Sequence, residues 1–332
     1  MIPARIVGFW ALLLLVASAA GLVLGTAVGS QGWEVWWTTT QDPVMQQIVW
    51  DIRLPRSLGA WLGGALLGLA GAIAQGLFRN PLADPYLLGS ASGASLGVSV
   101  YLSLFGGSML ATAWLPRLGM TGAAFAGAVL AVVLTLMLAR GVQQTLRLLL
   151  AGVVVGVVLG ALASLVGLFE PQVLQAMQGF MLGSTSFVGW TSCALMGAAL
   201  VLTLLVAWAL ARVLDALTLG EATAQSLGVP LRQARLLLVA AMSLATAAAV
   251  AQMGLIAFVG LAAPHAVRSL LRCTHVGLLL LSALMGGALL LLADVLARGL
   301  LAPQDLPVGV LTAVLGGVYL LWRMKHAAGG RT

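Results

Sequence analysis

Long apolar runs separated by short polar breaks fill this sequence from end to end. A helix needs about 20 consecutive apolar residues to cross the hydrocarbon core of a bilayer. Of the 332 residues, 61% are hydrophobic and only 8% are charged, whereas a soluble domain carries about 25% charged residues. A soluble fold of this composition could not cover its surface with polar groups. The runs therefore predict an all-α integral membrane protein, with residues 1–332 forming one polytopic domain.

The hydropathy breaks predict ten spans. The first run is longer than the apolar core of a signal peptide, about 7–15 residues, so we interpret it as a span. The eighth run is too short to cross as a regular helix, and we expect a half-length, tilted or buried segment. Glycines four residues apart, such as Gly64 and Gly68, predict close helix packing. The spans are 6–29, 57–78, 86–105, 118–139, 148–169, 189–211, 236–256, 258–268, 276–297 and 306–322.

The basic residues predict how the spans are oriented. With ten alternating spans and both termini in the cytoplasm, 12 of the 16 basic residues lie on the cytoplasmic side and 4 outside, as the positive-inside rule requires. The net charge of +7 is thereby explained without a nucleic-acid partner. The cytoplasmic set is Arg5, Arg79, Arg140, Arg147, Arg212, Arg232, Arg235, Arg268, Arg272, Arg323, Lys325 and Arg331, and the external set is Arg53, Arg56, Arg117 and Arg298.

Several chemistries lack the residues that they need. The single lysine, Lys325, lies near the C-terminus, so the chain has no Walker A loop for ATP. Two cysteines and three histidines without a ligand cluster predict no disulfide framework, metal site or cofactor. Residues 89–93 resemble a nucleophile turn, but alanine stands at its centre, so we interpret them as a serine-capped, closely packed helix start. An intramembrane enzyme would also need a nucleophile–base pair.

An ion-coupled secondary transporter is the main alternative to a transport subunit driven by ATP. Such transporters usually hold ionisable residues near the membrane midplane. The nine acidic residues all fall in loops or at span ends, and Asp294 is the deepest. We expect Asp294 to pair with Arg298, one helical turn away. ATP-dependent uptake into vesicles would separate the two alternatives.

Two proline-containing breaks resemble each other. The first covers residues 79–85 and is followed by residues 89–93, and the second covers residues 260–265. Each follows the first span of a group of four. The groups are the second to fifth and the seventh to tenth spans, with the sixth span and its loop between them. This spacing gives the groups opposite topology, which is typical of an inverted-repeat transporter.

The longest cytoplasmic loop, residues 212–235, contains a second candidate element. A short amphipathic helix is predicted between Gly220 and Gly228, with Leu219, Ala222 and Leu227 available for packing. Without further context, an ordinary surface connector is an equally good interpretation.

Several of these segments, taken in order, resemble a known permease family. The similarity extends over about residues 45–320, and it is to the permease subunits that import iron siderophores, haem and vitamin B12, the type II ABC importers. Its motifs are Arg53-Leu54-Pro55-Arg56, Arg79-Asn80-Pro81-Leu82-Ala83-Asp84-Pro85, Leu148-Leu149-Leu150-Ala151-Gly152-Val153, Leu219-Gly220-Glu221-Ala222, Phe258-Val259-Gly260-Leu261, Ala293-Asp294 and Leu306-Pro307-Val308-Gly309.

The resemblance implies partners and a division of labour. It implies a homodimer of ten-helix subunits in the cell inner membrane, surrounded by lipid. Two ATP-binding cassette subunits would hydrolyse ATP on its cytoplasmic side, and a periplasmic substrate-binding protein would dock on its outer side. The chain itself would perform no chemistry. Ferric siderophore, haem and cobalamin all remain possible cargoes.

The resemblance also implies three sets of site residues. The sets are Gly220, Glu221, Ala222, Leu227 and Gly228 for coupling to the ATPase, Arg53, Arg56 and Arg298 for docking of the binding protein, and Asn80, Leu82, Thr145 and Leu146 for the cytoplasmic gate. In the gate set, Leu146 stands where some family members carry a small polar residue. In the docking set, the alternative interpretation is that the arginines only anchor helix ends.

Overall fold

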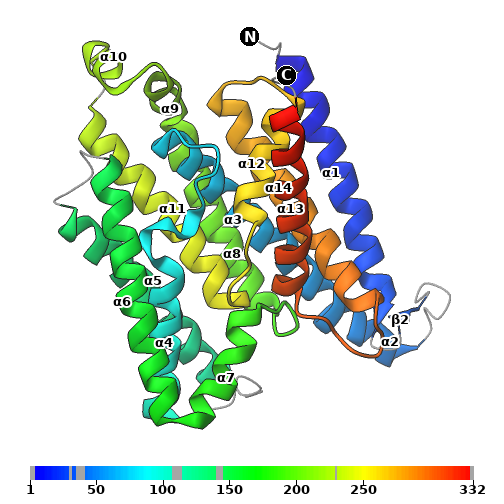
Figure 1. Ribbon diagram of the computed structural model, residues 1–332. Coiled ribbons are helices and arrows are strands. Elements are labelled where there is room, and N and C mark those ends of the chain that lie inside the picture. The colour runs from blue at the N-terminus through cyan, green and yellow to red at the C-terminus, as the bar shows by residue number, and fades with distance from the viewer. Residues whose placement is uncertain are drawn as a thin grey trace.

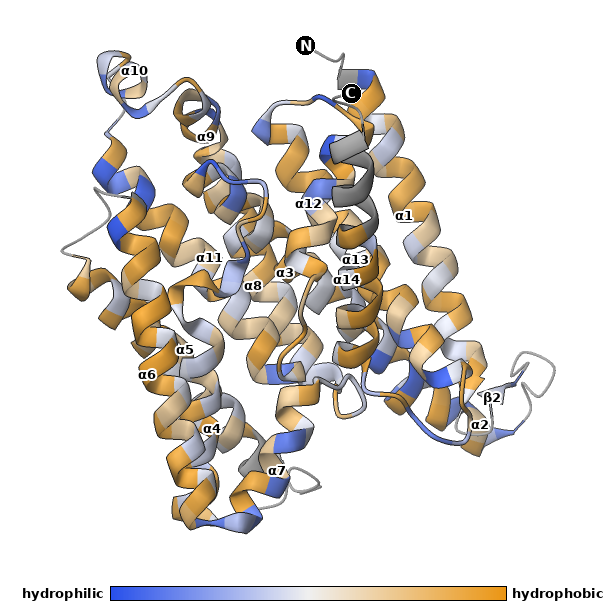
Figure 2. Cartoon of the chain, viewed as in Figure 1, coloured by the Kyte–Doolittle hydropathy of each residue, from blue (hydrophilic) through white to orange (hydrophobic). Residues whose placement is uncertain are grey.

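The computed structural model describes residues 4–29, 32–34, 42–106, 114–139, 145–228 and 230–329, and its dominant feature is a bundle of long helices (Figure 1). Within those residues, seven helices are long and apolar enough to cross a membrane, and two shorter apolar helices accompany them. Apolar residues run along the helices, while polar residues gather toward both ends of the bundle (Figure 2). The all-α membrane class predicted from the sequence is confirmed.

The elements follow the predicted spans closely. They are α1 (Ala4–Ala27), β1 (Val28–Gly29), β2 (Gly32–Trp33), α2 (Pro43–Ile48), α3 (Leu54–Phe78), α4 (Ser90–Phe105), α5 (Trp114–Leu138), α6 (Thr145–Phe169), α7 (Pro171–Leu182), α8 (Trp190–Ala209), α9 (Ala211–Thr218), α10 (Glu221–Ser226), α11 (Leu231–Met253), α12 (Val259–Leu270), α13 (His275–Gly299) and α14 (Val308–Gly329). The predicted spans correspond in order to α1, α3, α4, α5, α6, α8, α11, α12, α13 and α14.

The eighth span is short, as the sequence predicts. Helix α12 has 12 residues and contains Pro264. Twelve residues rise only about 18 Å as an α-helix, too little to cross the hydrocarbon core alone. Val259, Ala263 and Val267 are buried, so α12 is enclosed by its neighbours, where a broken backbone inside a membrane protein is tolerated.

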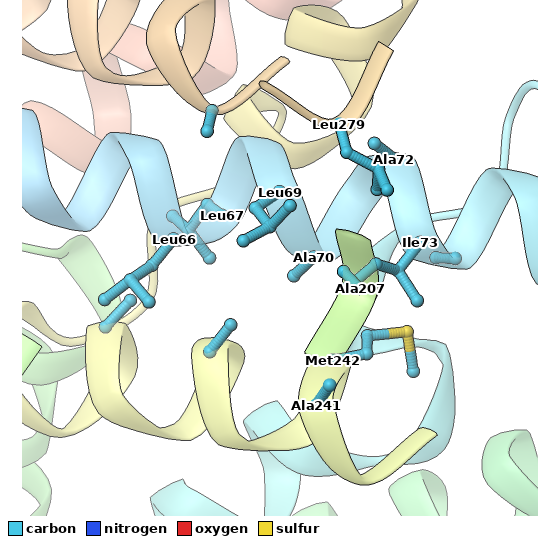
Figure 3. Packing of buried hydrophobic residues seen from close by; sticks show 14 of the residues in the cluster. Leu66, Leu67, Leu69, Ala70, Ala72, Ile73, Ala207, Ala241, Met242 and Leu279 are labelled. Atoms are coloured by element: carbon cyan, nitrogen blue, oxygen red, sulfur yellow. The ribbon is translucent and has the colours of Figure 1, made fainter. Parts of the chain in front are cut away.

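Helix α3 forms the centre of the bundle and packs most closely against α13. Any side chain added at Gly64 would overlap the carbonyl group of Gly286, and one at Gly68 would overlap that of Ser282. These glycines therefore bring the two backbones together, which is how helices associate in lipid. On the remaining faces of α3, Leu66 and Ile73 are fully buried (Figure 3).

The two groups of four helices pack across each other. Helix α3 packs against α12 and α13 of the second group, and α11 packs against α4 and α5 of the first. Helix α3 ends, and α11 begins, at the end of the bundle where α9 and α10 lie (Figure 1). The first helices of the two groups thus run in opposite directions, as the pattern of breaks predicts.

The two proline-containing breaks meet inside the bundle. The Tyr86 hydroxyl, just after the first break, donates to the Ile256 carbonyl just before the second, at 3.1 Å. A side chain at Gly260 would overlap the ring of Pro85. The first break thus packs against the second, and Tyr86 satisfies a backbone carbonyl that lipid could not.

Some local structure differs from the sequence-based expectation. Helix α7 was not predicted; it begins with Pro171 and buries Val173, Met177 and Phe180. Helix α4 does begin at Ser90, but the predicted serine cap is wrong. Gly89 occupies the cap with φ of +80°, no side chain caps the helix, and the Ser90 hydroxyl has no hydrogen-bond partner among the described residues.

Candidate functional site

The predicted site residues separate to the two ends of the bundle. The coupling and gate residues lie at the end that carries α9, α10 and both termini (Figure 1). The three arginines belong to the start of α3 and the end of α13 and to the turn between α2 and α3. Arg298 and Arg53 contact Val28 and Glu34 at the β1–β2 hairpin, which lies with α2 at the opposite end of the bundle (Figure 1). The chain therefore has two chemically distinct surfaces at opposite ends of the bundle.

The segment between α9 and α11 forms a glycine-bounded helix, as predicted. Helix α10 lies between Gly220 and Gly228, whose φ angles of +106° and +78° are rarely adopted by other residues. Leu219 and Leu227 are 65% and 63% exposed, and Ala222 is also exposed. Two apolar side chains thus project from the end of the molecule.

The base of this segment is held firmly. Leu214 and Leu217 on α9 are fully buried, and α9 packs against α3 and α13. The Asp215 carboxylate accepts a hydrogen bond from the backbone N–H of His275 at 3.0 Å and lies 2.7 Å from its Nδ1 atom. Asp215 thus ties α9 to the start of α13. No local sequence pattern predicts this pair, because its members are 60 residues apart.

Glu221 connects α10 to the rest of the bundle. Its Oε1 atom lies 2.6 Å from Nη2 of Arg235 on α11 and 3.7 Å from Nη2 of Arg79 at the end of α3. Arg235 is almost completely buried. Arg79 has φ of +50° and caps α3, immediately before the predicted gate residue Asn80. One carboxylate thus links the coupling segment to both central helices and to the gate loop.

The gate loop is shaped by two short polar turns. The Asn80 side chain accepts a hydrogen bond from the Leu82 N–H at 2.9 Å, and the Asp84 carboxylate accepts one from the Tyr86 N–H at 2.8 Å. Such side-chain-to-backbone bonds fix a turn without a regular element. Burial raises the pKa of the Asp84 carboxyl group, and the bond from Tyr86 partly opposes that rise.

The remaining gate residues lie at the start of α6, at the same end of the bundle. Leu82 in the loop and Leu146 on α6 are both exposed. Thr145 is the first residue of α6, but its side chain lies outside the described part of the structure. The 3-10 turn that follows the loop, Pro85–Leu88, packs against α6, so the loop and α6 form a continuous surface.

At the opposite end, a buried carboxylate organises the arginines. Asp294 on α13 is completely buried, and its Oδ2 atom lies 2.7 Å from Nη2 of Arg298, which confirms the predicted pair. Its Oδ1 atom lies 3.3 Å from Nε of Arg56 and accepts a hydrogen bond from the Thr185 hydroxyl. Arg56 also pairs with Asp305 at 2.8 Å. Asp294 therefore has partners on α3, on α13 and in the segment before α8.

Arg53 and Arg298 also hold the end of α1. Arg298 donates to the Gly25 carbonyl at 2.8 Å, and Arg53 donates to the Thr26 carbonyl at 3.2 Å and pairs with Glu34. Both arginines are buried, whereas Arg56 reaches the exposed carboxylate of Asp305. The long-range partners Glu34 and Asp305 were missed by sequence reasoning, because only the Asp294–Arg298 spacing is local.

A cavity of about 1050 Å³ opens beside this cluster. Its walls come from the first half of α5, from α7, from the segment between α7 and α8, from the start of α8, from the end of α11 and from the segment before α14. Amide and hydroxyl groups contribute most of its polarity, and Asp305 is the one ionisable group among the described residues that line it. The polar lining residues include Gln172, Gln175, Ser184, Ser186, Thr191, Ser192 and Gln252.

Together these features define a polytopic transport subunit: two groups of four helices with paired breaks, a polar cavity at one end, and a projecting helix at the other. The chain belongs to the FecCD transport family, whose sequence pattern matches residues 12–326.

Individual relatives agree with this assignment. The chain is 38% identical over 322 residues to the vitamin B12 import system permease protein BtuC of Escherichia coli O157:H7, covering 96% of this chain and 95% of that protein. It is 37% identical over 323 residues to the hemin transport system permease protein HmuU of Yersinia pestis, with the same coverage. A solved inward-facing structure of a metal-chelate type ABC transporter superposes with a TM-score of 0.83 at 26% identity, covering 96% of this chain and 99% of that one.

Proposed function

We propose that this chain is the permease subunit of an ATP-driven importer that moves a large metal chelate from periplasm to cytoplasm, with ATP hydrolysed by separate subunits. The observation that carries the proposal is the projecting helix α10, with Leu219 and Leu227 exposed and Glu221 tied to Arg235 and Arg79. Exposed apolar side chains on a firmly held helix suit a protein partner better than solvent. Vitamin B12 import by BtuC, hemin transport by HmuU and the metal-chelate type of the structural neighbour support the same class of cargo.

Coupling follows from the links already described. An ATPase subunit that seats α10 between its own domains would move Glu221 and, through Asp215, the start of α13. The ion pair with Arg79 and Arg235 would carry that motion to the ends of α3 and α11, beside Asn80. The bundle would then alternate between two packings that the ATPase biases. No reacting group is needed in the permease itself.

The gate is proposed to form across a homodimer. Leu82 and Leu146 are exposed in the single chain, where apolar groups favour burial. Two-fold symmetry would supply the same pair from a second copy. Asn80, Leu82, Thr145 and Leu146 would then seal the cytoplasmic end of a shared pathway, and the polar cavity near Asp305 would open at its outer end.

Docking of a periplasmic binding protein is proposed at the arginine end, with Arg56 as the contact. Asp305 is the exposed partner of Arg56, its side chain 44% accessible, so an acidic residue of a binding protein could replace it at the guanidinium. Arg53 and Arg298 would support this surface from beneath by fixing α1 against α3 and α13. In this proposal both termini and α10 lie in the cytoplasm and the chain spans the inner membrane, which is the orientation that the positive-inside rule favours.

Vesicle transport tests the function directly. The chain would be reconstituted with its ATPase subunits, and the cognate binding protein would be loaded in turn with cobalamin, haemin or a ferric siderophore. Uptake that requires ATP and the binding protein is expected, and the isolated permease should hydrolyse no ATP. Uptake driven by a proton or sodium gradient without ATP would instead support a secondary transporter.

A further inference from the structure

A cavity of about 1080 Å³ lies at the end of the bundle that carries α9 and the N-terminus. It is enclosed by the first turns of α1 and α13, the last turns of α8 and α12, and α9. The proposed coupling, gate and docking residues are not among the described residues that line it. It is therefore distinct from those three sets of residues, although Asp215 and His275, which connect α9 to α13, do line it.

Two arginines make the cavity basic. Arg268 is half-buried at the end of α12 and donates to the amide oxygen of Gln75, a neutral group. Arg272 is exposed in the short segment before α13. Within the described chain, neither arginine pairs with a carboxylate. A half-buried guanidinium loses hydration, and a neutral partner compensates less well than an anion would.

The other titratable groups that line the cavity do not neutralise the positive charge of these two arginines. The lining carboxylate, Asp215, is directed toward His275, as described above. Burial raises the pKa of the Cys273 thiol, which keeps it uncharged at neutral pH. The lining thus has two cationic side chains and one engaged carboxylate, so an added anion would be attracted.

An apolar wall continues from the basic groups along the side of the bundle. It is built by Leu204, Leu205 and Trp208 of α8 together with Leu280 of α13. Leu205 and Trp208 are largely exposed, although they belong to a membrane-spanning helix. Tryptophan favours the level of lipid headgroups. A soluble anion such as free phosphate would use the arginines but leave this wall uncovered.

We propose that this cavity binds an anionic phospholipid, with the phosphate at Arg268 and Arg272 and the acyl chains along Leu204, Leu205 and Leu280. Guanidinium groups match phosphate oxygens in a bidentate geometry, and basic pockets between membrane helices bind acidic headgroups. Because α9 and α13 both line the cavity, the bound lipid would contact the helices that flank the coupling segment. The inference does not depend on which way the chain faces, since both leaflets contain phosphate headgroups.

Native mass spectrometry of the detergent-purified, delipidated full chain tests the proposal. The probe is dioleoylphosphatidylglycerol, compared with the zwitterionic dioleoylphosphatidylcholine. The variants are Arg272→Glu and Arg268→Gln, with Arg212→Glu as a matched control, because Arg212 is exposed on α9 but does not line the cavity. We expect Arg268→Gln to lower phosphatidylglycerol affinity by about fivefold, from about 1 kcal/mol per basic residue, and the charge reversal Arg272→Glu to lower it at least as much. The control should match the wild type.

Three results would overturn this site. One is equal phosphatidylglycerol affinity in wild type and Arg272→Glu, a variant at an exposed position that keeps the test valid if Arg268→Gln fails to fold. Another is displacement of the lipid by millimolar glycerol 1-phosphate, which would indicate a soluble phosphate ligand. The third is loss of bound lipid when the ATPase subunits assemble, which would indicate a protein interface.

Discussion

Glu221 on the projecting helix α10 and Arg235 on the central helix α11 form an ion pair of 2.6 Å, in which the arginine is almost completely buried. The carboxylate is only partly exposed, so solvent screens this pair less than a surface pair. Arg79 approaches the same oxygen at 3.7 Å. Among the described residues, this pair is the shortest ion pair that joins α10 to α3 or α11.

Breaking this link should uncouple the transporter. Glu221→Gln and Arg235→Gln should each lower uptake by about tenfold, the effect of about 1.4 kcal/mol, while the assembled complex still hydrolyses ATP. The measurement is uptake per ATP hydrolysed in vesicles. Glu170→Gln, at the other end of the bundle, is the control. The double exchange Glu221→Arg with Arg235→Glu should restore part of the loss, and unchanged coupling in both single variants would exclude the proposed path.

The exposed leucines of this segment should carry the contact with the ATPase. Leu227→Asp places a charge on the projecting surface without disturbing a buried group, so folding should be preserved. Assembly with the ATPase subunits should weaken by about tenfold or more, since desolvating an unpaired carboxylate costs several kcal/mol. Leu227→Met is the control, and assembly is measured by co-purification. Wild-type assembly of the aspartate variant would remove Leu227 from the interface.

The glycine contacts of α3 yield a stability prediction. A methyl group at Gly64 would overlap the carbonyl of Gly286, so Gly64→Ala should destabilise the bundle by about 1–3 kcal/mol, the usual cost of overpacking. Gly8→Ala is a matched control on α1, because no atom lies within 4 Å of the added carbon there. Thermal unfolding in detergent should separate the two variants. Equal stability would mean that α3 and α13 can move apart without cost.

Replacing the buried carboxylate of Asp294, at the other end of the bundle, should lower stability more than Gly64→Ala does. Asp294→Asn leaves the guanidinium groups of Arg298 and Arg56 without their anion, and removing one partner of a buried pair costs about 3–5 kcal/mol. Asp305→Asn, at an exposed carboxylate, should cost less than about 1 kcal/mol. Unfolding temperatures of the two variants provide the comparison. A small loss of stability in Asp294→Asn would show that Thr185 and water can satisfy the guanidinium groups of Arg298 and Arg56 without a carboxylate.

The sequence predicts those parts of the fold that local pattern determines. Hydropathy gives the spans because each must fill the bilayer, and Pro264 with its short run identifies the enclosed helix α12. Gly220 and Gly228 predict the limits of α10 because the positive φ angles at these positions favour glycine. The spacing of Asp294 and Arg298 predicts a pair within one helix.

Features that depend on the three-dimensional arrangement could not be predicted from the sequence. Asp215 and His275 meet only because α9 folds against the start of α13. Arg53 and Arg56 resembled exposed contact residues, yet their ion pairs with Glu34 and Asp305 depend on how separate segments pack. The sequence does not predict helix α7, because its glutamines interrupt a short apolar stripe. The cavity lined by these glutamines was therefore not predicted either.

The rate at which the binding protein associates should depend on Arg56, and so should the salt dependence of that rate. Of the three arginines, Arg56 has the exposed partner, Asp305, while Arg53 and Arg298 contact α1 internally. Arg56→Glu should slow association with the binding protein and flatten its salt dependence, because charge pairs chiefly set orientation and on-rate. The wild-type rate should fall with ionic strength as the Debye length shrinks to about 8 Å at physiological salt.

The two buried arginines make a matched comparison for that experiment. If they only support the surface, Arg53→Gln should lower thermal stability while the folded fraction binds with an unchanged salt slope. Asp305→Asn should speed association, because it frees Arg56 for an acidic residue of the binding protein. Stopped-flow association rates across a salt series would separate the variants. A wild-type rate and slope in Arg56→Glu would eliminate Arg56 as the contact, and a changed slope in Arg53→Gln would assign docking to the buried pair instead.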